Sequence, residues 1–234
     1  MATPARDSPR GRSVGLLNTA CLIGLLAIAL AAVARTTAAQ APRELLLDPD
    51  RPEWQTPAPE VCTVVFDTSK GRIVAELRRE WAPHGVDRFY NLVRFGFYDE
   101  ARFFRVRPGT WVQFGIPGDP AIAQRWRNRT IPDDPLREPN LRGTLAYAFK
   151  DPNGRSTQVF INLRDNRATH DREFVPFGRI VEGLDVADAL HAGYGEGPGG
   201  IRAGTQDPVF EGGNAYLLKT YPRLDYVVRA TTRR

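Results

Sequence analysis

The stretch that decides the fold reads Phe103-Phe104-Arg105-Val106-Arg107-Pro108-Gly109-Thr110-Trp111-Val112-Gln113-Phe114-Gly115. It contains two short apolar runs, 103–106 and 111–115, of the length typical of β-strands. Further short apolar runs follow at 144–149, 159–163 and 177–181. Because these runs do not alternate regularly with helical segments, the pattern favours antiparallel over parallel strands.

The flanking segments complete the predicted architecture. The β-rich runs 61–67 and 71–77 are joined by Thr68-Ser69-Lys70-Gly71, which indicates a hairpin. Residues 83–95 have the apolar spacing of a helix, and a second helix is predicted over 183–191. With a last strand over 215–220, the order predicts a mostly β protein, an antiparallel barrel capped by two α-helices.

Three segments in this order resemble the cyclophilin family of prolyl isomerases. Residues 103–115 look like the family's F-[HF]-R-V-x-P-G-x-x-x-Q-x-G stretch. Residues 156–162 (STQVFIN) are similar to its S-Q-F-F-I segment, and residues 174–183 (FVPFGRIVEG) to its V-F-G-x-V-x-x-G segment. The resemblance covers about residues 61–220. It implies a closed antiparallel eight-stranded cyclophilin-like barrel and peptidyl-prolyl cis-trans isomerase activity without a cofactor or metal.

Arg105 is the catalytic residue that the resemblance implies. Resonance opposes rotation about a peptide bond with a barrier of ~18–20 kcal/mol. A catalyst must therefore stabilise the twisted amide more than either planar form. The proline nitrogen becomes pyramidal as the bond twists, and a guanidinium can donate a hydrogen bond to it only then. The alternative for Arg105 is a surface arginine in an ion pair.

Six further residues are implied to bind the substrate: Phe104, Trp111, Gln113, Phe160, His170 and Phe174. Gln113 would hold a peptide carbonyl, and Phe160 would form the floor of an apolar slot for the proline ring. The alternatives are a glutamine bonded to its own barrel, and a core phenylalanine. For Trp111 and His170, two alternatives likewise remain: each side chain contacts the substrate or packs within the protein.

The chain also departs from the family pattern. Thr110 stands where an apolar ring is common, Phe104 and Phe174 replace frequent histidines, and Phe149-Lys150 replaces Asn-Ala. These changes leave open a cyclophilin-like module that binds peptides or acts as a chaperone without isomerase activity. A hydrolase would need a base beside Ser156 or Thr157, and the sequence places no histidine near them.

Residues 1–39 are predicted to be a signal peptide or membrane anchor. Arg6, Arg10 and Arg12 precede a mostly apolar run over 14–33, and Thr37-Ala38-Ala39 fits the small-residue cleavage rule. The run also approaches the length of a membrane span, which leaves the anchor open. We therefore expect an exported, periplasmic or extracytoplasmic protein that meets the membrane only through this segment.

Cleavage would remove four arginines and one aspartate, lowering the net charge from +5 to +2. A nucleic-acid partner is therefore not expected. Cys62 would remain as the single cysteine, predicted to be a buried, inert thiol. The expected partners are unfolded or flexible polypeptides that contain proline, bound in extended form by a monomer.

The predicted domain boundaries follow from composition. Residues 40–60, rich in proline and acid, are predicted to be an extended linker. The isomerase domain is predicted over 61–221 and a C-terminal tail over 222–234. The glycine-rich stretch 193–204 lacks the preceding strand and the Lys-Ser/Thr of a phosphate loop, and its residues indicate no role.

Overall fold

The computed structural model describes Met1, residues 43–196 and residues 199–233. The residues from Glu44 onward form one compact unit, the folded domain of the chain. The predicted signal peptide or membrane anchor, residues 1–39, lies outside the described residues. Over the described ranges, every helix is too short or too polar to cross a membrane.

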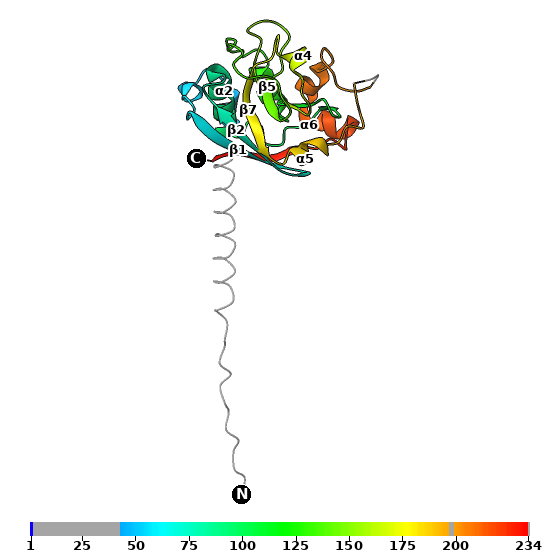
Figure 1. Cartoon of the computed structure of the whole chain (residues 1–234). Coiled ribbons are helices and arrows are strands. Elements are labelled where there is room, and N and C mark those ends of the chain that lie inside the picture. The colour runs from blue at the N-terminus through cyan, green and yellow to red at the C-terminus, as the bar shows by residue number, and fades with distance from the viewer. Residues whose placement is uncertain (2–42, 197–198, 234) are drawn as a thin grey trace. The chain divides into compact units, whose positions relative to one another are not determined.

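A curled sheet of eight antiparallel strands forms the centre of this domain (Figure 1). The strands are β1 (Val61–Thr68), β2 (Gly71–Arg78), β3 (Arg105–Arg107), β4 (Trp111–Phe114), β5 (Thr144–Tyr147), β6 (Val159–Asn162), β7 (Pro176–Glu182) and β8 (Val227–Arg233). Their spatial order is β3-β4-β6-β5-β7-β2-β1-β8. The predicted antiparallel, eight-stranded arrangement is therefore confirmed.

The closed barrel that was predicted is not what the structure has. β3 and β8 are the two edges of the sheet, and in the described part of the chain only an isolated bridge, Arg102 to Tyr226, joins the segments before them. β3 is only three residues long and ends at Arg107, before the turn over 108–110 that leads to β4. The sheet is thus a half-barrel that stays open along this edge.

Helices cover the sheet on more than one side. They are η1 (Pro52–Gln55), α2 (Pro83–Arg94), α3 (Pro120–Trp126), α4 (Arg167–His170), α5 (Leu184–Asp188) and α6 (Asp207–Thr220). The predicted helix over 83–95 is confirmed as α2, whose apolar residues Val86, Phe89, Leu92 and Val93 are all buried. The helix predicted over 183–191 is present as the shorter α5. In Figure 1, α2 and α6 lie on opposite sides of β5 and β7.

The strand predicted over 215–220 is wrong, because these residues belong to α6. A short apolar run fits a strand or a buried helix equally well, and Gly212-Gly213 interrupts the helical pattern. Gly213 has φ +52°, and a Cβ there would lie 2.2 Å from the carbonyl oxygen of Gly118. The tail predicted over 222–234 is also wrong, since it contains β8, which pairs with β1.

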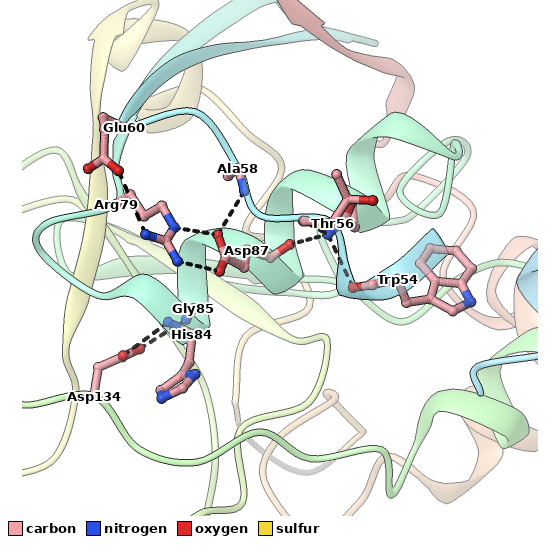
Figure 2. Close-up of polar contacts among 10 residues, drawn as sticks. Trp54, Thr56, Ala58, Glu60, Arg79, His84, Gly85, Asp87 and Asp134 are labelled. Atoms are coloured by element: carbon pink, nitrogen blue, oxygen red, sulfur yellow. Dashed lines mark hydrogen bonds and ion pairs between the residues drawn. The ribbon is translucent and has the colours of Figure 1, made fainter. Parts of the chain in front are cut away.

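The extended linker predicted over 40–60 is a packed part of the domain from Glu44 onward. Residues 43–47 are helical, and Leu46, Trp54 and Ala58 are buried in the main core. Figure 2 shows how polar contacts fasten the rest of this segment to α2. The Asp87 carboxylate accepts from the Ala58 N–H at 2.8 Å and from Arg79, while Asn91 donates to the carbonyls of Trp54 and Thr56.

A distant carboxylate caps the N-terminus of α2. Ala82, at the N-cap position, has no side chain that could accept the first N–H groups of the helix. Asp134 accepts from the backbone N–H groups of His84 and Gly85 instead, at 3.1 and 2.9 Å (Figure 2). The same carboxylate pairs with the buried Arg155 at 2.9 Å. The long proline-rich stretch before β5 is thereby fastened to α2.

Two apolar clusters hold the domain together. The barrel core packs α2 against the strands and includes the rings of Phe66, Phe89, Phe114 and Phe177, which meet at tilted or edge-on angles. The flanking cluster lies around α3 and α6: Phe104, Ile116, Ala123, Ile201, Val209, Phe210, Leu217, Tyr221 and Leu224. Cys62 is buried and free, and burial raises the pKa of its thiol to about 11, in agreement with the predicted inert thiol.

Candidate active site

Six of the seven predicted site residues line one cavity of about 650 Å³. They are Arg105 on β3, Trp111 and Gln113 on β4, Phe160 on β6, His170 at the end of α4, and Phe174 just after it. Strand register brings three of them together, because Arg105 is the pairing partner of Gln113, and Gln113 that of Phe160. The antiparallel ladder therefore places residues 8 and 47 positions apart side by side.

Aromatic rings form one end of the cavity. Phe160, His170 and Phe174 contact one another with ring centroids 5.2 Å apart and steep interplanar angles, the edge-to-face geometry that aromatic pairs prefer. Two more rings join this group: Phe149 contacts Phe174, and Trp111 contacts His170. This end of the cavity therefore presents an apolar surface of aromatic rings to a ligand.

His170 belongs to this aromatic end as a neutral side chain. Burial, and next the nearby charge of Arg164, lower the pKa of its imidazole below the ordinary value. Its Nδ1 lies 3.1 Å from Oδ1 of Asn162, and the amide nitrogen of Asn162 already donates to Asn140 and Thr144. The amide oxygen is therefore the acceptor and Nδ1 carries the proton, so that no charge is placed beside the apolar rings.

A row of polar side chains forms the other end. Arg105 Nη1 donates to Gln113 Oε1 at 2.9 Å, and Gln113 Nε2 donates to Gln158 Oε1 at 2.8 Å. Gln158 in turn donates to Gln206 Oε1 at 2.9 Å. The carboxylate of Glu196 accepts from Arg105 through both Nε and Nη2. Donors and acceptors thus alternate without a break from the carboxylate to Gln206.

Phe104 was predicted to bind substrate, but the structure does not place it with the other six predicted residues. Its side chain is 3% exposed, packs in the flanking cluster and does not line the cavity formed by the described residues. Successive residues of an extended strand point to opposite faces, so Arg105 and Phe104 cannot both face the cavity. A phenylalanine suits the apolar cluster that it meets there.

Sequence reasoning missed the residues that extend the polar end. Gln158 lies in the motif over 156–162, but no role was derived for it. Glu196 and Gln206 come from the segment around the glycine-rich loop, 91 and 48 residues away from their partners. No spacing rule links positions this far apart across an irregular loop. Arg127, Lys150 and Phe210 also line the cavity.

Comparisons with known proteins show the family and the fold. Residues 63–207 match the family described as cyclophilin type peptidyl-prolyl cis-trans isomerase/CLD. Peptidyl-prolyl cis-trans isomerase cyp18 of Streptomyces antibioticus is 36% identical over 138 residues, which are 55% of this chain and 82% of that protein. Peptidyl-prolyl cis-trans isomerase B of Escherichia coli is 32% identical over 136 residues, 54% and 82% of the two chains.

Solved structures show the same fold. The crystal structure of a cyclophilin-type isomerase from Cryptosporidium parvum aligns with TM-score 0.55 and 19% identity over 74% of this chain and 98% of that one. Cyclophilin AquaCyp293 from Hirschia baltica aligns with TM-score 0.51 and 22% identity over 75% of each chain. The chain belongs to the cyclophilin-type peptidyl-prolyl cis-trans isomerase family.

Proposed function

We propose that this chain accelerates rotation about X-Pro peptide bonds, with Arg105 donating a hydrogen bond to the twisted proline nitrogen. The observation that carries the proposal is that the Arg105 guanidinium and the aromatic end around Phe160 line one cavity. A proline ring among the aromatic rings would bring its nitrogen toward the polar end. Family membership supports the same activity.

Gln113 has two functions in this proposal. Its Oε1 accepts from Arg105, which restrains the guanidinium, and one of its two Nε2 hydrogens goes to Gln158. The second Nε2 hydrogen is available for a substrate carbonyl. Holding that carbonyl would limit which half of the peptide rotates. Gln113 is thus still proposed to bind substrate through Nε2, while its Oε1 accepts a hydrogen bond from Arg105.

Catalysis in this proposal is differential binding and involves no covalent step. The aromatic end binds proline in both isomers, and such uniform binding affects KM more than kcat. The guanidinium acts on the pyramidal nitrogen, an acceptor that exists only in the twisted state. In this proposal Arg105 therefore raises kcat, whereas Phe160, Phe174 and Trp111 contribute to substrate binding and so affect KM.

The test is a protease-free isomerisation assay on an X-Pro peptide, with residues 40–234 and their Arg105→Ala and Arg105→Lys variants. We expect Arg105→Ala to lower kcat by about 10²–10³-fold, the usual effect of removing one transition-state donor. The Arg105→Lys variant keeps the positive charge but lacks the planar guanidinium fork. Its kcat should therefore lie between those of wild type and Arg105→Ala. Peptide binding and the unfolding midpoint should be retained in both variants.

The second candidate function is a module that binds proline-containing peptides without isomerising them. The departures at Thr110 and at Phe149-Lys150 favour it, and Phe149 and Lys150 both line the cavity. A folded wild-type protein that binds the peptide without accelerating exchange would establish this module and exclude the isomerase.

We further propose that the protein acts outside the cytoplasm on unfolded or flexible exported polypeptides, as a monomer. The support is the sequence of residues 1–39, which has the layout of a secretory leader. Expression of the full chain in a bacterial host tests it. A soluble product of the cell envelope beginning at Gln40 is expected, whereas an intact chain in the membrane fraction would establish the anchor.

A further inference from the structure

Glu196 contacts two arginines beside the cavity. Its Oε1 accepts from Nε and Nη2 of Arg105, and its Oε2 lies 3.8 Å from Nη1 of Arg107. Both guanidinium groups also lie over the ring of Trp111, with Cζ 5.3 and 4.9 Å from the ring centroid. The side chains of Arg105 and Glu196 are 19% and 27% exposed, so water only partly screens the pair.

The loop that carries Glu196 is fastened on both sides of it. On the N-terminal side, Tyr194 packs edge-on against Tyr221, and its hydroxyl accepts from the Arg223 N–H at 3.0 Å. On the C-terminal side, Tyr221 donates to the Gly199 carbonyl at 2.7 Å, and Ile201 is buried in the flanking cluster. Glu196 therefore lies between two points, Tyr194 and Gly199, at which the chain contacts the folded domain.

A count of the Arg105 donors shows what the contact does. A guanidinium has five N–H bonds. Glu196 takes the one on Nε and one on Nη2, and Gln113 takes one on Nη1. One N–H on each terminal nitrogen remains without a partner among the described residues. Because opposite sides of the group are held, its plane is fixed and the two free N–H bonds have a defined direction.

We propose that Glu196 is a positioning residue for catalysis, which holds the Arg105 guanidinium so that its two free N–H bonds meet the twisted amide. The proposal rests on the isomerase function proposed above. The same loop supplies Gln206, which accepts from Gln158 at the far end of the polar row. One segment outside the half-barrel thus closes both ends of the row that orients the catalytic cation.

This role differs from that of an ion pair that only stabilises the fold. A partly exposed ion pair contributes little to stability, so its loss should barely change the unfolding midpoint. Loss of orientation at Arg105 acts instead on the twisted state, which is the state that this side chain contacts. The change should therefore appear in kcat, while KM, set mainly by the aromatic end, should stay nearly constant.

The test compares Glu196→Ala, Glu196→Gln and wild type by exchange NMR on an X-Pro peptide at several peptide concentrations. For Glu196→Ala we expect kcat to fall about tenfold, less than the ~100-fold that a 1 Å misplacement of a reacting group costs. KM should change less than about twofold, since binding to both planar isomers is retained. Glu196→Gln keeps an acceptor oxygen for Nε and Nη2 and should recover most of the rate.

A second readout follows Arg105 itself. The Nε–H resonance of a fixed arginine is shifted and protected from exchange with water, and it should be lost in Glu196→Ala and retained in Glu196→Gln. Glu76→Gln is the matched control, because it breaks an ion pair with Arg78 and Arg179 on the sheet away from the cavity. The control should keep wild-type kcat and the Arg105 resonance.

Three results would overturn the proposal: unchanged kcat in Glu196→Ala, a change confined to KM, or a higher kcat. The last would mean that the carboxylate competes with substrate for the guanidinium. Failure of the isomerase function itself is distinguishable, because then the wild type would not accelerate exchange, or Arg105→Ala would keep its rate. Comparable unfolding midpoints for all variants exclude a folding defect.

Discussion

The barrel core and the flanking cluster are both apolar, but the chain builds them in different ways. The barrel core takes alternate residues from neighbouring strands, such as Val64 and Phe66 of β1 and Ile73 and Ala75 of β2. The flanking cluster collects scattered residues from one strand end, two helices and a glycine-rich loop. A periodic pattern therefore specifies the first, whereas the second depends on the tertiary path of long connections.

The two regions also contribute differently to the cavity. The half-barrel supplies the predicted residues Arg105, Gln113 and Phe160 from three adjacent strands. The flanking cluster supplies Phe210 directly and supports the loop that carries Glu196 and Gln206. Under the proposed function, one region provides the catalytic groups and the other orients them, so stability and activity should respond differently to changes in each.

The largest effect is expected in the barrel core. Phe114 is 1% exposed and its ring contacts those of Phe66, Tyr98 and Phe103. Phe114→Ala should destabilise the protein by about 3–5 kcal/mol, the range for truncating a buried phenylalanine. Urea unfolding measures the change. If Phe114→Ala lowers the free energy of unfolding less than Leu217→Ala in the flanking cluster does, the two regions do not differ as described.

A smaller loss of stability, with a change in activity, is expected in the flanking cluster. Leu217 is 3% exposed on α6, and Leu217→Ala should cost about 2 kcal/mol, the low end of the range, because a small cluster can collapse around the change. The rate of X-Pro isomerisation should fall with it, through displaced Phe210 and Gln206. The neighbouring Leu218 is 53% exposed, and Leu218→Ala should leave both quantities unchanged.

The attachment of the N-terminal segment should have a still smaller effect. Asp87→Asn removes the charge from a group that accepts from the Ala58 N–H and from Arg79. We expect a loss of about 1 kcal/mol, in the range of one hydrogen bond, with an unchanged isomerisation rate. Calorimetry and the peptide assay test this. A loss of activity would mean that residues 43–60 also influence the cavity.

The smallest effect is the pH dependence contributed by His170. Burial lowers the pKa of its imidazole in the folded protein below the ordinary value of 6.5. As pH falls through 6.5 the unfolded chain takes up this proton before the folded one, so the stabilisation present above this pH declines below it. Wild type should lose more stability between about pH 7.5 and 5.5 than His170→Gln does. Equal losses would place His170 in a solvated site.

The predictable part of the site depends on local motifs joined by strand register. Arg105, Gln113 and Phe160 could be identified because each lies in a short motif, and antiparallel pairing then brings the motifs together. Phe104 shows the limit of that reasoning, since strand alternation directs it to the opposite face. Glu196 could not be identified, because its contact depends on a glycine-rich loop whose path no sequence period reports.

The predictable part of the fold follows the same division. Strands β1 to β7 and α2 show apolar spacing and were predicted nearly in place, whereas β8 was taken for a C-terminal tail. α6 was mistaken for a strand because Gly212-Gly213 breaks its helical spacing and leaves a short apolar run. The segment from residue 43 to 60 was mistaken for a linker because isolated residues, Leu46 and Trp54 among them, bury it without any period.

The pairing of β8 with β1 has a consequence for the order of events during synthesis. Thr63 pairs with Arg233, so the first strand of the sheet is completed by a strand that lies far later in the chain. Until those residues leave the ribosome, β1 exposes an unpaired edge, and contacts this distant in sequence form slowly. The nascent chain therefore stays incompletely folded at least until β8 has been made, an interval in which chaperones or a translocation machinery could still bind it as an open polypeptide.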